Sequence, residues 1–166
     1  RIYQSVIDKE RRGDYLGKTI QVVPHITNEI KRMMMRVDDP KHYDFIITEV
    51  GGTIGDIESA PFMEAIRQLK WELGKRAVSA HLTYIPYLKA AGELKTKPTQ
   101  HSVKEMQGMG IQPEVLILRT EHHLDQPILD KVAMFCNVDT DCVVQSEDLP
   151  SIYDVPVNMQ RQGLDA

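Results

Sequence analysis

The sequence predicts an α/β fold with a mainly parallel sheet and flanking helices. Short apolar runs rich in β-branched residues alternate with segments of helical periodicity, and glycine or proline marks most of the boundaries. Strands that alternate with helices imply right-handed crossovers between parallel neighbours. The 166 residues are 42% hydrophobic, enough to bury one core of ordinary size, so we expect a single domain over residues 1–166 and no second domain.

The N-terminal segment contains one expected helix and one candidate strand. Thr27 is placed to cap a helix that runs through Met33 and Met34, and residues 19–23 form a candidate short strand. The polar stretch at residues 36–42 (RVDDPKH) is expected to be a surface loop.

A buried strand is predicted at residues 45–47 (FII), a continuous apolar run of the kind found in sheets covered on both faces. A helix should begin near Pro61, with Ser59 as its N-terminal cap, and end at Gly74. Its apolar side chains recur at helical spacing and are Phe62, Ile66, Leu69 and Leu73.

The second half of the chain repeats the alternation of strand and helix. Strands are predicted at residues 81–87, 115–118 and 142–144. Helices are predicted at residues 98–107 and 127–135, between these strands. The order supports a sheet built from parallel crossovers.

Charge and composition exclude several classes of protein. The net charge of -4 argues against a general binder of nucleic-acid backbones, which usually carries a basic surface. No apolar stretch is long enough to cross a bilayer, and the N-terminal residues lack a signal-peptide pattern. Cys136 and Cys142 match no disulfide framework or metal pattern. We therefore expect a cytoplasmic protein with neither nucleic-acid nor membrane partners.

The most informative segment is residues 49–58 (EVGGTIGDIE). Glu49 ends an apolar run and is followed by three glycines and then by Asp56 and Glu58. Glycines allow close approach of the main chain to a ligand, and carboxylates hold Mg²⁺ or a ribose hydroxyl. A solvated carboxylate at a strand end is the alternative, and the residues alone leave both interpretations open.

A second glycine-rich segment resembles a phosphate-binding loop without meeting its requirements. Between Gly13 and Gly17 stand three residues, whereas that loop needs four before its Gly-Lys pair. The segment also follows a charged stretch rather than an apolar strand. We expect an ordinary turn at residues 13–19.

The segment at residues 95–100 (KTKPTQ) places two ammonium groups, two hydroxyls and an amide just before a predicted helix. Helix N-termini favour anions, so a phosphate could bind here, although a solvated loop is the alternative. Lys131 alone is a weaker signal, because most lysines on a helix face are solvated.

Two further candidates carry little chemistry. His122 and His123 are adjacent, and no third ligand stands at a familiar zinc spacing, so we expect surface histidines. Cys136 lacks the flanking glycines of a nucleophile elbow, so we do not expect it to act as a catalytic thiol.

Five segments together carry a resemblance to the synthetase (amidoligase) domain of the CTP synthase family, over nearly the whole chain. They are KERRGDYLGKTIQVVPHIT, EVGGTIGDIESAPFMEAIRQ, GELKTKPTQHSVKE, MFCNV and SIYDVP. The match resembles the later part of that domain, and the family's P-loop segment and glutaminase domain have no counterpart among these residues. The chain starts with Arg1 rather than Met, and we expect a piece of a longer enzyme that forms no CTP alone.

The resemblance implies a P-loop-NTPase-like (dethiobiotin synthetase-like) fold. It also implies that ATP phosphorylates the 4-oxygen of UTP and that ammonia derived from glutamine displaces the phosphate, with Mg²⁺ required. The family is a homotetramer whose nucleotide site is shared across subunits.

The resemblance also implies roles for particular residues. Glu49 would bind Mg²⁺, and the adenine of ATP would lie against Glu147, Asp148 and Leu149. UTP or CTP would be held by Asp56, Ile57, Glu58, Lys95, Thr96, Lys97, Pro98, Thr99, Gln100 and Lys131. No residue is assigned as a catalytic nucleophile, because the attacking groups belong to the substrates.

Two alternatives stay open at this point. One is a related ATP-dependent amidoligase of the same fold, against which the KTKPTQ and GDIES segments count. The other is a non-catalytic oligomerisation fragment in which these segments only form a subunit interface.

Overall fold

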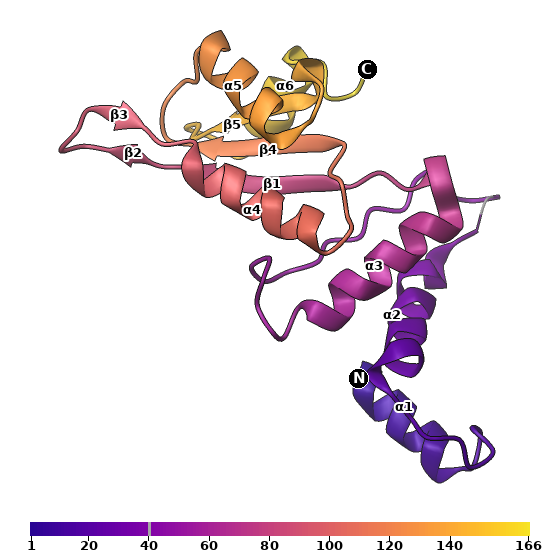
Figure 1. Cartoon of the computed structure of the whole chain (residues 1–166). Helices are drawn as coiled ribbons and strands as arrows, with labels where there is room; N and C mark the ends of the chain where they lie inside the picture. Colours follow the sequence, from indigo (N-terminus) through magenta and orange to yellow (C-terminus); the bar gives the residue numbers. More distant parts are fainter. Residues whose placement is uncertain (40) are drawn as a thin grey trace. The chain divides into compact units, whose positions relative to one another are not determined.

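A parallel sheet with helices on both faces confirms the predicted α/β class (Figure 1). The computed structural model describes residues 1–39 and 41–166, which divide into two units, Arg1–Arg76 and Ala77–Ala166. Each unit has its own hydrophobic core. The prediction of one domain for the whole chain stays a prediction.

The first unit is helical. Val6, Ile26, Ile30 and Ala65 form its buried core, and the edge of Phe62 packs against them. The core joins the helices near the N-terminus to the long helix that follows the glycine-rich segment. The elements are α1 (Ile2–Arg11), the π-helical turn η1 (Val22–Ile26), α2 (Thr27–Met34), the 3-10 turn η2 (Met35–Val37), α3 (Ala60–Leu73) and η3 (Gly74–Arg76).

The predicted strand at residues 19–23 is wrong. Residues 22–26 instead form η1, closed by the main-chain N–H of Gln21, which donates to Nδ1 of His25 at 3.0 Å. Pro24 has no N–H to donate to a sheet, and no strand occurs among the described residues of this unit. A strand needs a partner, and η1 satisfies the main chain locally instead.

The predicted buried strand at residues 45–47 is also wrong. The segment belongs to no strand, and Phe45 and Ile47 are 86% and 96% exposed. The β-branched composition indicates the capacity to join a sheet, but pairing requires another strand, which the described part of this unit does not contain.

The predicted cap at Ser59 is confirmed in position, whereas the predicted cap at Thr27 is wrong. Ser59 is the N-cap residue of α3, but its Oγ donates to the carbonyls of Asp56 at 2.8 Å and Thr53 at 3.3 Å rather than accepting a helix N–H. Thr27 is the first residue of α2 and donates to the carbonyl of Pro24 at 3.2 Å. Hydroxyls bind neighbouring carbonyls as readily as helix N–H groups, so spacing alone does not predict a side-chain cap.

The end of α3 at Leu73, before Gly74, confirms the predicted boundary. Its fully buried side chains, however, are Met63 and Ala65, and the predicted apolar stripe is only half-buried. The loop predicted at residues 36–42 begins within η2, and Pro40 lies outside the described residues.

The second unit contains the sheet. β1 (Ala80–Ile85) pairs with β4 (Val115–Thr120), which pairs with β5 (Val143–Glu147), and both pairings are parallel. The connecting helices are α4 (Lys97–Gly108) and α5 (Gln126–Cys136), and they confirm the predicted elements to within one or two residues. The remaining elements are the antiparallel strands β2 (Tyr87–Leu88) and β3 (Glu93–Leu94), the turn η4 (Thr140–Cys142) and α6 (Asp154–Arg161).

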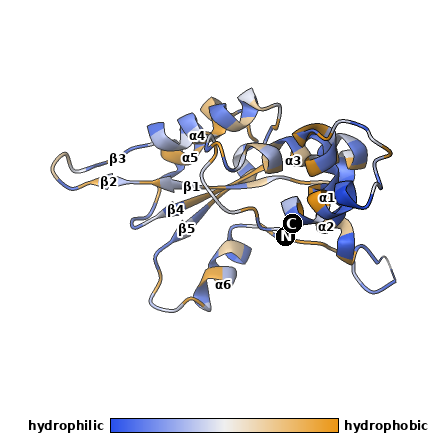
Figure 2. Cartoon of the chain, turned by 90° about the horizontal axis from the view of Figure 1, so that it is seen from below, coloured by the Kyte–Doolittle hydropathy of each residue, from blue (hydrophilic) through white to orange (hydrophobic). Residues whose placement is uncertain are grey.

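Helices cover the two faces of this sheet unequally. Figure 2 shows α4 and α5 on one face and α6 on the other. Ile85, Leu116 and Leu118 are fully buried within the core of this unit. On β1, Leu82 and Tyr84 alternate with the buried residues and stay 62% and 45% exposed, so one face of this strand is left uncovered.

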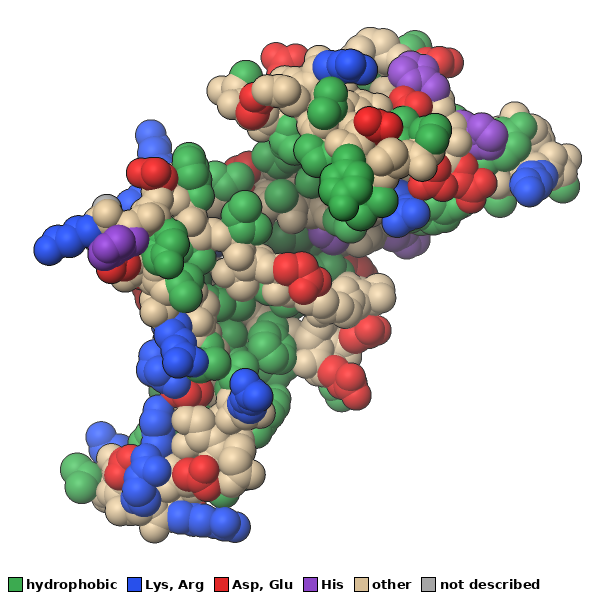
Figure 3. All heavy atoms as spheres, turned by 180° about the vertical axis from the view of Figure 1, so that it is seen from behind, with side chains coloured by type: hydrophobic (Ala, Val, Ile, Leu, Met, Phe, Trp, Pro, Cys, Tyr) green, Lys and Arg blue, Asp and Glu red, His purple; other side chains and the backbone are tan. Residues whose placement is uncertain are grey.

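Exposed apolar side chains are frequent on both units (Figure 3). Among them are Phe45, Ile47 and Trp71 in the first unit, and Ile152 and Tyr153 in the second. Isolated exposed apolar residues are ordinary, but parallel sheets are normally covered on both faces. No helix among the described residues is long and apolar enough to cross a membrane.

Candidate functional site

The carboxyl ends of the three parallel strands meet at one edge of the sheet in the second unit. The segments that leave this edge are Pro86 after β1, residues 121–123 after β4, and Asp148 with Leu149 after β5. In open α/β sheets this edge is where ligands bind. The predicted site residues of this unit are therefore expected at this edge.

The KTKPTQ segment begins α4 at this edge. The N–H of Lys95 donates to the carbonyl of Pro86 at 2.9 Å. Inside the unit, Oγ1 of Thr99 donates to Oγ1 of Thr83 at 3.0 Å and contacts the carbonyl of Tyr84 at 3.3 Å. These bonds fix the start of the helix against the end of β1.

The six residues of this segment divide into two groups. Thr96, Thr99 and Gln100 are buried, and Nε2 of Gln100 donates to Oγ1 of Thr96 at 3.1 Å. Lys97 and Pro98 are exposed, and Lys95 is half-buried and paired with Glu93. Lys97 is thus available to an anion, whereas Lys95 is already paired with a carboxylate and the three buried polar side chains shape the helix start.

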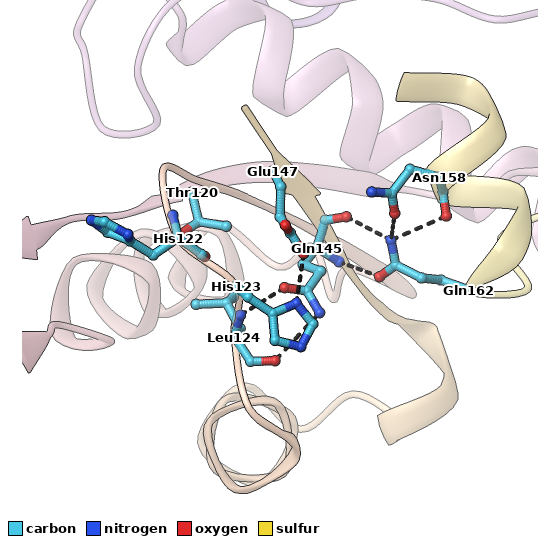
Figure 4. Close-up of polar contacts among 8 residues, drawn as sticks. All are labelled: Thr120, His122, His123, Leu124, Gln145, Glu147, Asn158 and Gln162. Carbon is cyan, nitrogen blue, oxygen red and sulfur yellow. Dashed lines mark hydrogen bonds and ion pairs between the residues drawn. The ribbon is translucent and has the colours of Figure 1, made fainter. Parts of the chain in front are cut away.

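The end of β5 places the predicted adenine-contacting residues at the same edge. The N–H of Asp148 donates to the carbonyl of Thr120 at 3.0 Å, and its carboxylate lies 3.3 Å from Arg119. Glu147 is partly buried, and its Oε1 lies 2.7 Å from Nδ1 of His123 (Figure 4). Leu149 is half-buried.

Lys131 lies on α5 with its side chain exposed. Among the described residues, no ion pair holds its ammonium group in place. An exposed lysine on a helix is compatible with a nucleotide contact but does not require one.

The glycine-rich segment belongs to the first unit. Gly52 and Gly55 have φ angles of +95° and +97°, which a side chain would strain. The N–H of Asp56 donates to the carbonyl of Thr53 at 3.1 Å and closes a turn. Glu49, Asp56, Ile57 and Glu58 are all exposed.

A hollow of about 500 Å³ lies beside Glu49 in the first unit. Its walls are mostly apolar and include Ile30, Met33 and Phe62. Such a lining desolvates an anion without pairing it, so this hollow does not suit a triphosphate. Glu49 borders this hollow and is exposed, and Asp56 and Glu58 are exposed as well.

The exposed carboxylate of Glu49 suits a magnesium ion that is bound together with a nucleotide. Within residues 1–39 and 41–166, no three His, Cys, Asp or Glu side chains gather into a metal site. Mg²⁺, however, usually takes one or two carboxylates together with phosphate oxygens and water, rather than an all-protein cage. The single exposed carboxylate of Glu49 suits a metal that arrives with a nucleotide.

The alternative chemistries have no support in the geometry. His122 and His123 are exposed, as predicted, and the rings point in different directions (Figure 4). Cys136 is fully buried, and burial raises the pKa of its thiol to about 11, so it is an inert core residue. The segment at residues 13–17 forms turns, as predicted.

The contacts of the β4–α5 loop are what sequence reasoning missed. Besides the His123–Glu147 pair, the hydroxyl of Tyr84 donates to Glu121 at 2.9 Å, and His122 meets the ring of Tyr87 edge-on at 4.3 Å. All three contacts join neighbouring strand ends. Residues from separate strands carry no mutual spacing signal, so only the sheet register could have placed them together.

A parallel sheet whose carboxyl edge carries a lysine-bearing helix start defines an α/β protein with a candidate anion-binding edge. Residues 1–166 match the family described as CTP synthase N-terminus. The chain belongs to that family. The match assigns the chain to the N-terminal region of the enzyme without separating an earlier from a later part, so the narrower prediction of a later part lacking the P-loop is not confirmed.

Individual relatives agree with this assignment. The CTP synthase of Bacteroides thetaiotaomicron is 68% identical over 166 residues, covering 100% of this chain and 31% of that protein. Those of Porphyromonas gingivalis and Desulfitobacterium hafniense are 64% and 56% identical, over 99% of this chain and 31% of each protein. The chain thus spans about a third of the length of these relatives, and they do not favour the alternative of a different amidoligase.

Proposed function

We propose that this chain is the part of a CTP synthase that holds the pyrimidine nucleotide and its magnesium ion. The full-length protein would use ATP and ammonia from glutamine to convert UTP into CTP. The family match over all 166 residues carries this proposal. The exposed GDIE turn and the KTKPTQ helix start are consistent with it, because each presents charged groups at a place where a ligand can reach them.

The proposed reaction determines what this chain must do. Phosphorylation turns the 4-oxygen of UTP into a leaving group, and ammonia then forms the new C–N bond as phosphate departs. Both attacking groups belong to substrates, so the protein has to bind, orient and exclude water. Magnesium, when bound with the nucleotides, neutralises the negative charge that gathers on the phosphates.

Each segment has a role in this proposal. Glu49 would hold magnesium, and residues 56–58 would bind the nucleotide, with the carboxylates of Asp56 and Glu58 accepting from its hydroxyl groups. Lys95 and Lys97 would bind phosphate at the start of α4, a helix of 12 residues whose N-terminal N–H groups also favour an anion. Lys131 would add a further positive charge.

The ATP-binding part of the site is proposed at the end of β5, where residues 147–149 would contact adenine. A phosphate-cradling P-loop would then have to come from outside residues 1–166, because the only Gly-Lys pairs here lack its spacing. We further propose that both units belong to one synthetase domain, that the fragment alone is inactive, and that the full-length protein is a cytoplasmic homotetramer. The exposed run at residues 45–47 would be covered in that protein.

The substitution Lys95→Ala in the full-length protein tests this assignment. We expect the Kd for UTP to rise about tenfold, the order lost with one charge-assisted contact, and the Kd for ATP to change less than twofold. Lys89→Ala is the matched control, because Lys89 is exposed in the turn between β2 and β3. Equal losses for UTP and ATP would point to general destabilisation and contradict the assignment.

A further inference from the structure

Gln145 is a buried amide in the middle of β5, 6% exposed. Its Oε1 accepts from the N–H of Leu124 at 2.7 Å, and its Nε2 donates to the carbonyl of Leu124 at 3.3 Å (Figure 4). Leu124 is itself 1% exposed and closes the loop between β4 and α5. One side chain therefore satisfies both main-chain groups of a buried loop residue.

The main chain of Gln145 is held from the other side. Its N–H donates to Oε1 of Gln162 at 2.9 Å, and its carbonyl accepts from Nε2 of Gln162 at 2.8 Å. Gln162 is fixed in turn by Oδ1 of Asn158 on α6, at 2.6 Å. Because β5 is the edge strand of the sheet, the amide of Gln162 takes the place of a neighbouring strand.

Two more contacts fasten the same loop to the end of β5. Nδ1 of His123 lies 2.7 Å from Oε1 of Glu147, and the N–H of Asp148 donates to the carbonyl of Thr120. The loop residues 120–124 are thus tied to residues 145, 147 and 148. The contacts of residues 147 and 148 lie within the segment where adenine is proposed to bind.

We propose that Gln145 is a positioning residue for ATP, assisted at the rim by His123. The paired amide sets the distance between the loop and the end of β5, and the His123–Glu147 contact holds the Glu147 side chain against the loop. This inference rests on the proposed function, since it concerns the part of the proposed site that binds ATP.

The physical reason for a glutamine here is the buried N–H of Leu124. An aliphatic side chain of similar size would leave this donor without a partner in the core, which costs far more than an exposed hydrogen bond. The loop would then shift toward solvent to hydrate it. The end of β5 would then lose its contacts with the loop at residues 120–124. The KTKPTQ helix start would keep its place, because it is anchored on β1 through Thr99.

The test measures binding of a non-hydrolysable ATP analogue and of UTP to the full-length protein, together with hydrogen exchange at Leu124. For Gln145→Leu we expect faster exchange at Leu124, a Kd for the ATP analogue raised about fivefold to tenfold, and a Kd for UTP changed less than twofold. Gln160→Leu is the matched control, because Gln160 is an exposed glutamine of α6 bonded to Asp165.

Surface variants keep the test decisive if Gln145→Leu does not fold. His123→Ala should raise the Kd of the ATP analogue about threefold, and His123→Gln, which can still donate to Glu147, should restore it. An unchanged Kd for the analogue in folded Gln145→Leu or in His123→Ala, or an equal loss for UTP, overturns the positioning role. Failure of the unsubstituted protein to bind either nucleotide overturns the proposed function itself.

Discussion

Glu49 shows what a single residue contributes to this account. Its side chain is exposed, and Gly51 and Gly52 follow shortly after it in the chain. A carboxylate that has no structural task can be replaced without damage to the fold, so its chemistry can be tested separately from stability.

We expect Glu49→Gln to lower turnover of the full-length enzyme on the order of 100-fold, because it removes the charge proposed to hold magnesium. The free energy of unfolding should change by less than about 0.5 kcal/mol. Steady-state kinetics across a magnesium titration, with urea unfolding alongside, checks both points. Asp44→Asn is the control, being an exposed acid five residues earlier; full activity of Glu49→Gln would remove the metal role.

His81 provides a residue-scale prediction about pH. Its ring is 8% exposed, its Nε2 lies 2.8 Å from Oγ of Ser102, and burial lowers its pKa below the ordinary 6.5. His81 of the unfolded chain therefore takes up a proton at a higher pH than His81 of the folded protein, and stability falls as pH decreases through 6.5.

Urea unfolding at pH 7.5 and 5.5 measures this dependence. We expect the unsubstituted protein to lose stability at the lower pH and His81→Gln, which cannot be protonated, to lose less. An identical loss in both proteins would show that other groups cause it.

At the scale of elements, one buried carboxylate joins α1 to α2. Glu29 is 3% exposed and accepts from Ser5 at 2.9 Å, from Lys9 at 2.7 Å and from Arg32. The Arg32 hydrogen bond, helped by Lys9 and Ser5 and opposed by burial, lowers the pKa of Glu29 to about 2. The two helices thus depend on one charged side chain.

This arrangement predicts acid sensitivity of the first unit. The stabilisation is fully present above the ordinary pKa of 4.5 and is lost progressively as pH falls toward 2. Glu29→Gln should cost about 2 to 3 kcal/mol at pH 7 and flatten the acid dependence. Unfolding monitored between pH 3 and 7 checks this, and an unchanged acid dependence in the variant would contradict it.

Elements of the second unit could be predicted from the sequence, whereas several of the first could not. The alternation of apolar strands and amphipathic helices placed β1, β4, β5, α4 and α5, because each strand pairs with a strand 27 or 35 residues away in the chain. Residues 45–47 read equally well as a strand, but no described strand of their unit pairs with them. The hydroxyls of Ser59 and Thr27 do not bind helix N–H groups for another reason, since both donate to preceding carbonyls instead.

The candidate site was predictable as segments but not as an arrangement. Residues 95–100 and 147–149 proved to share one edge of a sheet, which follows from parallel strand order. The sequence did not distinguish the exposed Lys97 from the buried Thr99 and Gln100, because a helix start gives no sign of which side faces the core. The loop contacts of His123 arose from register alone.

At the scale of the whole molecule, the chain supplies about a third of the length of its relatives. The uncovered face of β1 and the exposed run at residues 45–47 are surfaces that a larger protein can bury. The proposed activity therefore belongs to the full-length enzyme, to which this chain would contribute the segments proposed to bind UTP and magnesium.

The most direct measurement is hydrogen–deuterium exchange of the full-length protein with and without UTP and Mg²⁺. The account predicts that the ligand slows exchange both in residues 49–58 and in residues 95–100, with little change in α1. Slowed exchange in only one of these segments, or in neither, would contradict the proposal that each of them takes part in binding UTP.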